Sequence, residues 1–496
     1  MKKIAVVLVS CFGYIFVAPV CAAKVSENSL RTHIKILASD EYEGREPGTE
    51  GEKKTINYIA NAWKSAGLVP AGPDGSWYQP VPLAQYGQSI AKMVFSSEGR
   101  TLKFNADEVI LTGRDSIYQK KAIPVVFGGY GFRADGTVIS NVSGKIILLL
   151  ADRAASAANP ARSTNAAKDA LILAGAEGVI MVAGGEPGNW AATRRQFLSG
   201  PVTIESDLTR APVEGAISSE FAVGMVTAAF RDWDKLRGEA KAANFDTVPL
   251  GINAAFDITT PIKRFDSQNV IGKIPGKNPG SGSVLFMAHW DHLGICRPES
   301  KEDRICNGAV DNASGIAVVT EVARALSKAR YDRDIYFLAT TAEEKGLLGA
   351  KHFAAHPVVP LDQIVVALNI DTIAVAATGA KVVIIGRGNT KLDSDVDSVT
   401  RKMKRKVETS LDSNSFVRRQ DGWALSEKGV PALMVGGAFA DLSLLEKFLA
   451  SDYHGPKDEL TAATVLSGAA EDADLHIALG KYFANIKSFR GNKAGS

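Results

Sequence analysis

The 496-residue chain is poor in cysteine, in aromatic residues and in net charge. It has four cysteines and 7% aromatic residues, and its 57 Lys and Arg almost balance its 54 Asp and Glu. A near-neutral chain has no basic stripe with which to bind nucleic acid, and no polybasic segment for a membrane surface. Its 46% hydrophobic content excludes collagen-like, coiled-coil and disordered proteins. At roughly 100 to 200 residues per domain, more than one domain is expected.

Long apolar runs are lacking except at the N-terminus. Lys2 and Lys3 precede a mostly apolar run over residues 4–20, and the small residues Ala22 and Ala23 follow it. This order is typical of a secretory signal peptide, so we predict a protein exported to the periplasm or the extracellular space. An uncleaved anchor helix is the alternative, but the run is short for a bilayer. No later stretch reaches the ~20 apolar residues of a membrane span, so no stable span is predicted after cleavage.

Removal of residues 1–23 leaves two cysteines, Cys296 and Cys306. An even pair, ten positions apart in an exported protein, predicts one disulfide that closes a short loop. Two buried free thiols and two soft metal ligands are the competing interpretations.

The distribution of apolar residues predicts an α/β fold. Helical spacing occupies residues 29–68 on both sides of a Gly-rich break at 43–48. Short β-rich runs follow at 123–127, 145–151, 178–182 and 221–226, with one helix near 165–174. The last part alternates strands at 284–289, 334–339, 364–370, 382–385 and 432–435 with helices at 314–327 and 470–486. Such alternation predicts a mostly parallel central sheet with helices on both faces.

Polar clusters follow several predicted strands of the last part, where open α/β sheets bind their ligands. His289 and Asp291 share one face of the chain, so Asp291 can hydrogen-bond one ring nitrogen and leave the other for a metal. Asp311 opens a helix, where taken alone it could be an N-cap. Glu343 and Glu344 are adjacent carboxylates after a buried strand, an arrangement that is costly unless a cation lies nearby.

Two further clusters complete the set. Asp371 ends an apolar strand, and His454 follows Tyr453 in a predicted loop. None of these residues has the order of a zinc finger or of a His-Glu-x-x-His helix. Together they supply what two divalent ions about 3.5 to 4 Å apart require, namely a bridging acid plus a His and a carboxylate for each ion.

Five motifs of the chain resemble, in order and spacing, those of the two-zinc exopeptidase family that contains secreted bacterial leucyl aminopeptidases and glutamate carboxypeptidases. They are His289-Trp-Asp291-His292-Leu-Gly, Asp311-Asn-Ala-Ser-Gly315, Glu343-Glu344-Lys-Gly-Leu-Leu-Gly349, Asn369-Ile-Asp371 and Tyr453-His454. The resemblance covers about residues 29–115 and 256–488. It implies the zinc exopeptidase fold.

The resemblance also implies a ligand set and catalytic roles. Two Zn²⁺ per chain are expected, one bound by His289 and Asp371, the other by Glu344 and His454, with Asp311 bridging them. Glu343 corresponds to the general base, Asp291 to the residue that orients the first histidine, and Tyr453 to an oxyanion stabiliser. Spacing does not decide which of the two adjacent glutamates is the base, so that assignment comes from the resemblance.

Residues 119–254 resemble a protease-associated domain, through Gly128-Gly-Tyr-Gly131, Gly144-Lys-Ile-Ile-Leu-Leu-Leu150 and Gly175-Ala-Glu-Gly-Val-Ile-Met-Val182. Such an insert could be passive, or it could act as a lid or size filter over the cleft. The predicted organisation is a signal peptide (1–23), a peptidase domain in two parts (24–118 and 255–490), the β-rich insert (119–254) and a flexible tail (491–496).

The predicted function is that of a secreted zinc aminopeptidase acting on peptides with a free N-terminus, with a metal-activated water and Glu343 as general base. A carboxypeptidase or dipeptidase of the same family is the first alternative. Relatives of that type append a long helical dimerisation domain, whereas 42 residues follow His454 here. An inactive binding module is the second alternative. Gln420-Asp421-Gly422-Trp423 stands where relatives often have Ser-Asp-His and a Phe, so the side-chain preference does not transfer.

Overall fold

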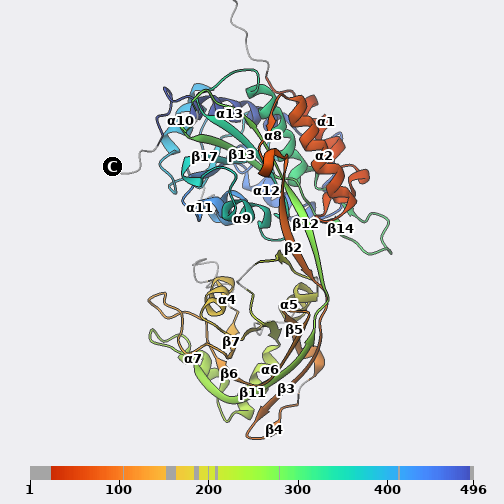
Figure 1. Ribbon diagram of the computed structural model, residues 1–496, viewed down its shortest axis with the longest axis vertical. Helices are drawn as coiled ribbons and strands as arrows, with labels where there is room; N and C mark the ends of the chain where they lie inside the picture. Colours follow the sequence, from red (N-terminus) through yellow and green to blue (C-terminus); the bar gives the residue numbers. More distant parts are fainter. Residues whose placement is uncertain are drawn as a thin grey trace, which may run out of the picture.

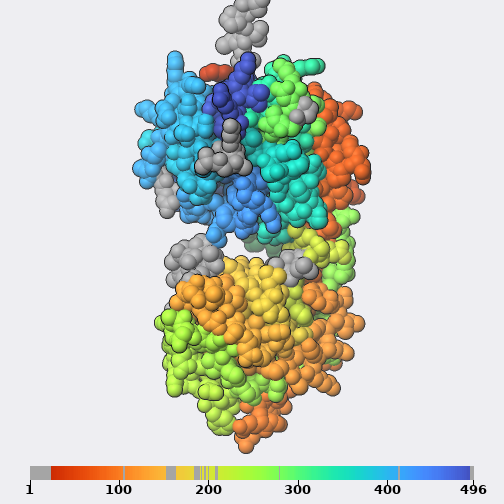
Figure 2. Space-filling model, turned by 60° about the vertical axis from the view of Figure 1, so that its left-hand side comes forward, coloured from red at the N-terminus to blue at the C-terminus, as the bar shows by residue number. Residues whose placement is uncertain are grey.

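The chain folds into two lobes, which Figure 1 shows one above the other. The computed structural model describes residues 24–103, 105–151, 163–183, 189–198, 200–206, 210–278, 280–410 and 414–491. The predicted signal peptide and all of the predicted tail except Gly491 lie outside these residues. Two long strands, β2 (Tyr78–Tyr86) and β12 (Ile262–Ile274), run from one lobe toward the other as an antiparallel pair. The space-filling view shows a cleft that enters between the lobes from one side (Figure 2).

The first lobe is built on a nine-stranded sheet whose centre is parallel. The four central strands are β19 (Ala432–Gly436), β17 (Ile364–Asn369), β13 (Ser283–His289) and β16 (Asp334–Thr340), in that spatial order. Antiparallel strands flank them, namely β18 (Val383–Ile385) on one side and β12, β2, β9 (Val202–Ile204) and β1 (Val69–Pro70) on the other.

Helices cover both faces of this sheet because the central strands are apolar on both sides. Val284 and Phe286 of β13 pack into one core, and Leu285 and Met287 pack into another. The first core includes residues of α1 (Glu27–Leu37), α2 (Glu50–Ser65), α8 (Ser314–Leu326), α10 (Asp393–Lys402) and α13 (Ser467–Phe483). The second includes residues of α9 (Leu348–Ala355) and α11 (Gly422–Ser426). The predicted α/β architecture, with helices on both faces of a mostly parallel central sheet, is confirmed.

The remaining elements of the first lobe are short. They are α12 (Leu442–Ser451), the single turns η1 (Asp40–Arg45), η2 (Pro73–Gly75), η5 (Ala309–Ala313), η6 (Leu361–Gln363) and η7 (Asn414–Arg419), and the hairpin of β14 (Gly294–Ile295) with β15 (Ile305–Cys306). The predicted disulfide joins Cys296 to Cys306 in this hairpin, with their Cα atoms 5.7 Å apart.

The second lobe is built on an eight-stranded mixed sheet of its own. Its strands, in spatial order, are β4 (Arg100–Thr101), β3 (Ile90–Ser97), β11 (Val248–Thr259), β6 (Ile117–Phe127), β7 (Ile146–Leu150), β8 (Gly178–Val182), β10 (Val213–Ile217) and β5 (Val109–Gly113). Its helices are α4 (Thr164–Leu173), α5 (Asn189–Leu198), α6 (Ser219–Ala228) and α7 (Trp233–Glu239), and η3 (Ala106–Glu108) is a single turn.

Residues 90–113, which the sequence-based division places in the peptidase domain, belong to this second sheet. Strand β3 pairs with β11, and β5 pairs with β10. The side chains of Phe95, Val109 and Leu111 lie in the core of the second lobe. Both strands pair with partners that lie far away in the sequence, so no local pattern marks these pairings.

The β-rich run predicted at 221–226 is wrong, because these residues lie in helix α6. Ser218 caps this helix by accepting a hydrogen bond from the backbone N–H of Phe221 at 3.0 Å. The buried side chains are Phe221, Ala222, Met225 and Val226, whose spacing places them on one face of a helix. Local hydrophobicity alone does not distinguish such a short helix from a buried strand.

No helix in the described part of the chain combines the length and the apolar character needed to cross a membrane.

Candidate metal centre

The predicted ligands come from five segments that meet at one edge of the first sheet. His289 is the last residue of β13, Asp371 follows β17, and Glu344 follows β16. Asp311 lies in η5 just before α8, and His454 follows α12. Because the carboxyl ends of parallel strands open at the same edge of a sheet, residues far apart in the sequence come together there.

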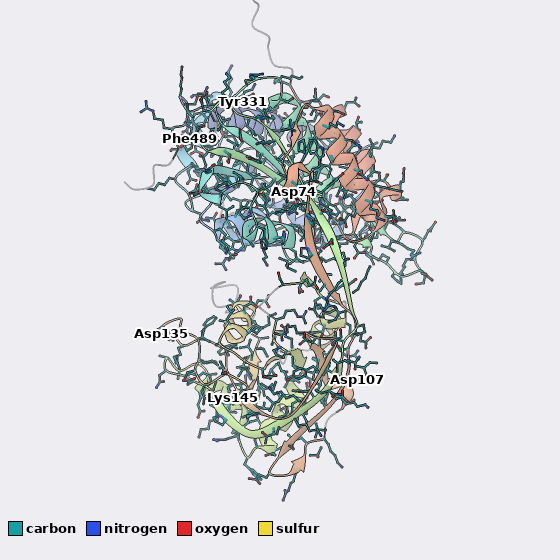
Figure 3. The ribbon with its side chains drawn as sticks, viewed as in Figure 1. Asp74, Asp107, Asp135, Lys145, Tyr331 and Phe489 are labelled. Atoms are coloured by element: carbon teal, nitrogen blue, oxygen red, sulfur yellow. A yellow bond between two sulfur atoms is a disulfide. The ribbon has the colours of Figure 1, made fainter. Side chains whose placement is uncertain are left out.

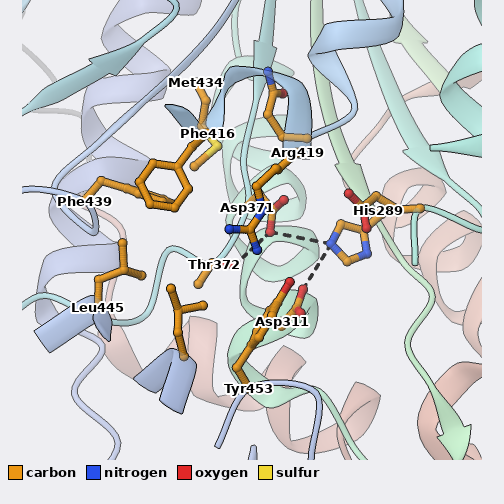
Figure 4. Close-up of a pocket in the computed structure, with 13 residues that line it drawn as sticks. His289, Asp311, Asp371, Thr372, Phe416, Arg419, Met434, Phe439, Leu445 and Tyr453 are labelled. Atoms are coloured by element: carbon orange, nitrogen blue, oxygen red, sulfur yellow. Dashed lines mark hydrogen bonds and ion pairs between the residues drawn. The ribbon is translucent and has the colours of Figure 1, made fainter. Parts of the chain in front are cut away.

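The first ligand group is His289, Asp311 and Asp371. The His289 Nε2 atom lies 3.2 Å from Asp311 Oδ1 and 3.5 Å from Asp371 Oδ1. Figure 4 shows both carboxylates turned toward the imidazole ring. All three side chains are at most 11% exposed, so a cation bound between them would be largely shielded from water.

The second group is centred on Glu344. Its Oε2 atom lies 2.9 Å from His454 Nε2, and its Oε1 atom lies 2.7 Å from His292 Nδ1. His454 Nε2 also lies 3.4 Å from Asp311 Oδ2. Asp311 therefore turns one carboxylate oxygen toward His289 and the other toward His454, which is the arrangement that a bridging ligand needs.

His292 has no role in the sequence-based ligand set, yet the structure places it in this group. Its side chain is fully buried, and it forms a possible metal-binding cluster with Asp311 and Glu344. His454, by contrast, is 40% exposed. The only sequence signal for His292 is its position directly after Asp291, because its contact with Glu344 depends on how β13 and β16 lie side by side.

Asp291 is buried beneath the first group. Its carboxylate Oδ1 lies 3.9 Å from His289 Nδ1, while its backbone carbonyl oxygen lies 3.2 Å from the same nitrogen. The carboxylate also accepts a hydrogen bond from the backbone N–H of Glu343 at 3.1 Å. Burial raises the pKa of Asp291 to about 6. Asp291 thus connects the loop after β13 to the loop after β16.

Two further residues hold the segment that carries Asp311, and neither belongs to the predicted site. The Asp458 carboxylate accepts hydrogen bonds from the backbone N–H groups of Val310 and Asp311. The Asn312 side chain donates to the carbonyl oxygen of Ile370 at 3.1 Å, which ties η5 to the end of β17. The sequence places Asp458 near His454 but does not indicate that it reaches η5.

The charges of the cluster are strongly interdependent. Burial opposes ionisation of Asp311, but hydrogen bonds from His289 and His454 lower the pKa of this carboxyl far below its usual range. Burial and the neighbouring negative charges raise the pKa of Glu343 well above its usual range. Burial also raises the pKa of Asp421 to about 7. Although burial disfavours its charged form, contacts with Asp311 and Glu344 raise the pKa of His454 to about 9.

The donor set and the burial of these residues fit a metal ion. Buried carboxylates are stable as charges only when cations lie beside them. The donor atoms are imidazole nitrogens and carboxylate oxygens, which bind zinc and similar divalent ions. Among the described residues, His292 Nε2 is buried without a hydrogen-bond partner, and His289 Nε2 faces the carboxylates of Asp311 and Asp371. Arrays of this kind are typical of metal sites rather than of structural cores.

A pocket opens beside the first ligand group (Figure 4). Its floor includes His289, Asp311, Glu343 and Asp371. The other lining residues are Thr372, Phe416, Arg419, Gln420, Met434, Phe439, Leu445, Leu449 and Tyr453. One side of the pocket is therefore a polar floor and the opposite side is an apolar wall.

Tyr453 lines this pocket next to the second group. Its ring stacks on that of His454, with ring centroids 3.7 Å apart. Burial and the surrounding carboxylates raise its pKa above the usual value, so the phenol keeps its proton at neutral pH. Tyr453 can therefore donate a hydrogen bond into the pocket.

Comparison with known proteins identifies the family of the segment that contains this site. Residues 269–473 match the model described as peptidase family M28. This segment is a peptidase family M28 domain. The M28 segment includes all five predicted ligands and Glu343, and the expected family is confirmed for it.

Individual relatives match the chain over shorter stretches. It is 38% identical over 104 residues to Aminopeptidase YwaD of Bacillus subtilis, a match that covers 20% of this chain and 21% of the relative. It is 33% identical over 92 residues to the Vacuolar membrane protease of Schizosaccharomyces pombe, covering 18% and 10% of the two chains. These alignments span no more than about a fifth of either relative.

A solved structure extends the likeness to both lobes. The aminopeptidase from Aneurinibacillus sp. strain AM-1 has a TM-score of 0.52 and 18% sequence identity. The match covers 93% of this chain and 94% of that one. The two proteins therefore share a fold, including the lobe inserted before the M28 segment.

Proposed function

We propose that the chain is an exported zinc-dependent aminopeptidase that hydrolyses N-terminal residues from peptides with a free amino terminus. The observation that carries the proposal is the position of Asp311. Its two carboxylate oxygens face two separate ligand groups, beside a pocket that has an apolar wall. The aminopeptidases among the relatives and the solved structures support the same reaction class. Export is supported by the signal-like N-terminus and by the Cys296–Cys306 disulfide, because disulfides persist in oxidising compartments.

The proposed centre holds two zinc ions. His289 and Asp371 would bind one ion, Glu344 and His454 the other, and Asp311 both. We keep His454 as the ligand because its Nε2 atom lies near both Asp311 and Glu344. His292 Nδ1 lies 3.9 Å from Asp311 and holds Glu344 from its buried side.

When bound, zinc supplies an activated water at neutral pH and polarises the peptide carbonyl. Glu343 lines the pocket and is the residue that accepts the proton of the attacking water and passes it to the leaving amine. The phenolic O–H of Tyr453 donates a hydrogen bond to the oxyanion that develops on the substrate. The polar floor orients the scissile bond, and the apolar wall receives the N-terminal side chain.

The geometry also supports the division of roles between the two adjacent glutamates. Glu344 contacts two histidines and does not line the pocket. Glu343 lines the pocket, and its backbone is fixed by Asp291.

One observation favours the carboxypeptidase alternative. Arg419 lines the pocket, is exposed, and has no carboxylate partner in the described part of the chain. A free cation in the pocket could bind the terminal carboxylate of a peptide.

The deciding experiment uses protein without residues 1–23. It compares hydrolysis of aminoacyl-nitroanilides with that of N-blocked peptides, with chelator and after zinc is restored. The aminopeptidase proposal expects chelator-sensitive release from free amino termini only. Release of residues from the carboxyl end of blocked peptides would establish the alternative. Binding of about two zinc ions with no hydrolysis of either set would indicate a binding module.

A further inference from the structure

Arg45 is a buried arginine that the proposed reaction does not use. It lies at the end of η1, in the Gly-rich segment Glu43-Gly-Arg-Glu-Pro-Gly48 between α1 and α2, and only 1% of it is exposed. Arginine is rarely buried to this degree unless its charge and its N–H groups are satisfied. No ion pair joins it to a carboxylate among the residues that the structure describes, so its partners must be of another kind.

Those partners are main-chain carbonyl groups from three segments. Arg45 Nε donates to the carbonyl oxygen of Trp290 at 2.8 Å, and Nη2 donates to that of Gly308 at 2.9 Å. Nη1 donates to the carbonyl oxygens of Leu37 and Asn307 at 2.7 and 2.5 Å. The planar guanidinium therefore binds several backbone acceptors at once, which the single ammonium group of lysine cannot reproduce.

Three of the four carbonyls that Arg45 binds, those of Trp290, Asn307 and Gly308, belong to segments that carry metal ligands. Trp290 stands between His289 and Asp291, and Gly308 begins the turn that leads to Asp311. The backbone carbonyl of Arg45 also accepts a weak hydrogen bond from the N–H of His292 at 3.4 Å. One side chain thus fixes the distance between the loop after β13 and the turn before α8.

The neighbouring backbone leaves no room for this segment to move away. A Cβ atom at Gly44 would lie 2.4 Å from the carbonyl oxygen of Cys306, and Gly44 has a φ of +64°. Glycine is required there because the chain both turns in the left-handed region and touches the β14–β15 hairpin. The Arg45 backbone is therefore held in place independently of its side chain.

Arg45 also adds a fixed positive charge beneath the carboxylates. Burial lowers its pKa to about 10, so the guanidinium remains charged at neutral pH. The negative charges of Asp458, Asp291 and Asp311 act in the opposite direction and favour the charged guanidinium. Its charge opposes the mutual repulsion of these acids without occupying the space of a metal ion.

We propose that Arg45 is a positioning residue that sets the zinc affinity of the centre. It does so by holding the His289–Asp291 loop and the Gly308–Asp311 turn at a fixed distance from each other. This inference rests on the proposed metal centre, but not on which end of a peptide is cleaved. Residues that orient metal ligands without touching the metal typically change metal affinity by about 10- to 100-fold when mutated.

A second buried arginine supplies the matched control. Arg333 is 2% exposed and donates to the carbonyl oxygens of Ser281, Phe483 and Phe489 at 2.7 to 2.8 Å. These acceptors lie outside the ligand segments, and Figure 3 places Phe489 toward the outer end of the first lobe. Arg333→Lys therefore removes the same kind of side-chain-to-carbonyl contact without touching the metal-ligand loops.

The experiment measures zinc binding by competition with a chromophoric chelator for wild-type protein, Arg45→Lys and Arg333→Lys, together with thermal unfolding of each metal-free protein. We expect Arg45→Lys to bind zinc at least about tenfold more weakly, while Arg333→Lys lowers the unfolding temperature but keeps wild-type zinc affinity. Equal zinc affinity in all three proteins, or equal losses in the two variants, would overturn the proposal.

The remaining outcomes are also decisive. If Arg45→Lys folds only when zinc is added, metal binding and the Arg45 contacts are coupled, and the proposal stands. If it folds under neither condition while Arg333→Lys does, Arg45 is needed for the fold rather than for metal affinity, and the proposal fails. Wild-type protein that binds zinc without hydrolysing peptides would refute the proposed activity alone. Wild-type protein that binds no zinc would refute both proposals.

Discussion

The carboxylate of Asp458 accepts a hydrogen bond from the backbone N–H of Asp311 at 2.9 Å. Its other oxygen accepts from the N–H of Val310 at 2.8 Å, and its backbone carbonyl accepts from the N–H of Ala309 at 3.0 Å. A loop that follows His454 in the sequence therefore holds the turn that carries the proposed bridging ligand. Through this contact, the positions of Asp311 and His454 depend on each other.

Asp458→Asn should weaken zinc binding by about 10- to 100-fold, because the asparagine amide puts a donor where one of the two backbone N–H groups needs an acceptor. Zinc competition with a chelator measures the change. Asp474→Asn is the matched control, since Asp474 also accepts from a backbone N–H, that of Val25 at 3.0 Å, but lies outside the site. Wild-type zinc affinity in Asp458→Asn would show that the turn keeps its geometry without Asp458.

Glu343→Gln should lower kcat by about 10²- to 10⁴-fold while zinc content stays at the wild-type level, because the amide cannot accept the proton of the attacking water. Glu344→Gln should lose zinc as well as activity, since Glu344 lies within 2.9 Å of His454 and 2.7 Å of His292. Metal analysis and steady-state kinetics on both variants separate the two roles. Loss of zinc from Glu343→Gln alone would reverse the assignment.

The buried His476 should make the fold acid-sensitive. Its Nε2 atom donates to the carbonyl oxygen of Val435 at 2.8 Å, and burial lowers its pKa to about 4. The unfolded chain binds this proton at a pKa of about 6.5. Stability is therefore lost as the pH falls from about 6.5 toward 4, by about 3 kcal/mol from this group.

His476→Gln keeps a donor and cannot ionise, so its free energy of unfolding should fall less than that of the wild type over this pH range. Urea unfolding of both proteins in chelator at several pH values measures the difference, and chelation removes the contribution of zinc. A constant gap between the two proteins from pH 7 to pH 4 would show that His476 does not titrate in this way.

Arg419 should disfavour substrates with a cationic N-terminal side chain, because its exposed guanidinium lines the same pocket as the apolar wall. In Arg419→Met, kcat/KM for lysyl-nitroanilide relative to norleucyl-nitroanilide should rise by about fivefold, equivalent to about 1 kcal/mol of repulsion between two nearby charges in water. Arg418→Met is the control, since Arg418 lies over the Trp423 ring and does not line the pocket. An equal change in both variants would indicate a general charge effect.

The sequence predicts the ligand-bearing strands well because each of them is a short apolar run followed at once by polar residues. His289 ends strand β13 and Asp371 follows strand β17, and the carboxyl ends of neighbouring parallel strands must lie close together. The parallel sheet, its helices and the disulfide could be predicted for the same reason, since local patterns determine them.

The residues that support the site could not be predicted, because they act on backbone groups of distant segments. Arg45 and Asp458 bind main-chain carbonyl and N–H groups, which every residue possesses, so no residue pattern marks these contacts. The contact of His292 with Glu344 depends on how two strands lie side by side. The second lobe was predicted less accurately, because β3 and β11 pair across a long stretch of sequence.

Strands β2 and β12 connect the two lobes, and the ends that they present to the second lobe lie side by side. Gly87 donates from its backbone N–H to the carbonyl oxygen of Pro261 at 2.8 Å, and the neighbouring residues Tyr86 and Ile262 are paired in the ladder. The start and end of the second lobe are therefore adjacent, and a tight turn could replace the whole of residues 88–260. Only the three-residue strand β9 would be lost from the first sheet. The second lobe is therefore a unit whose replacement would leave the other strands of the first sheet in place.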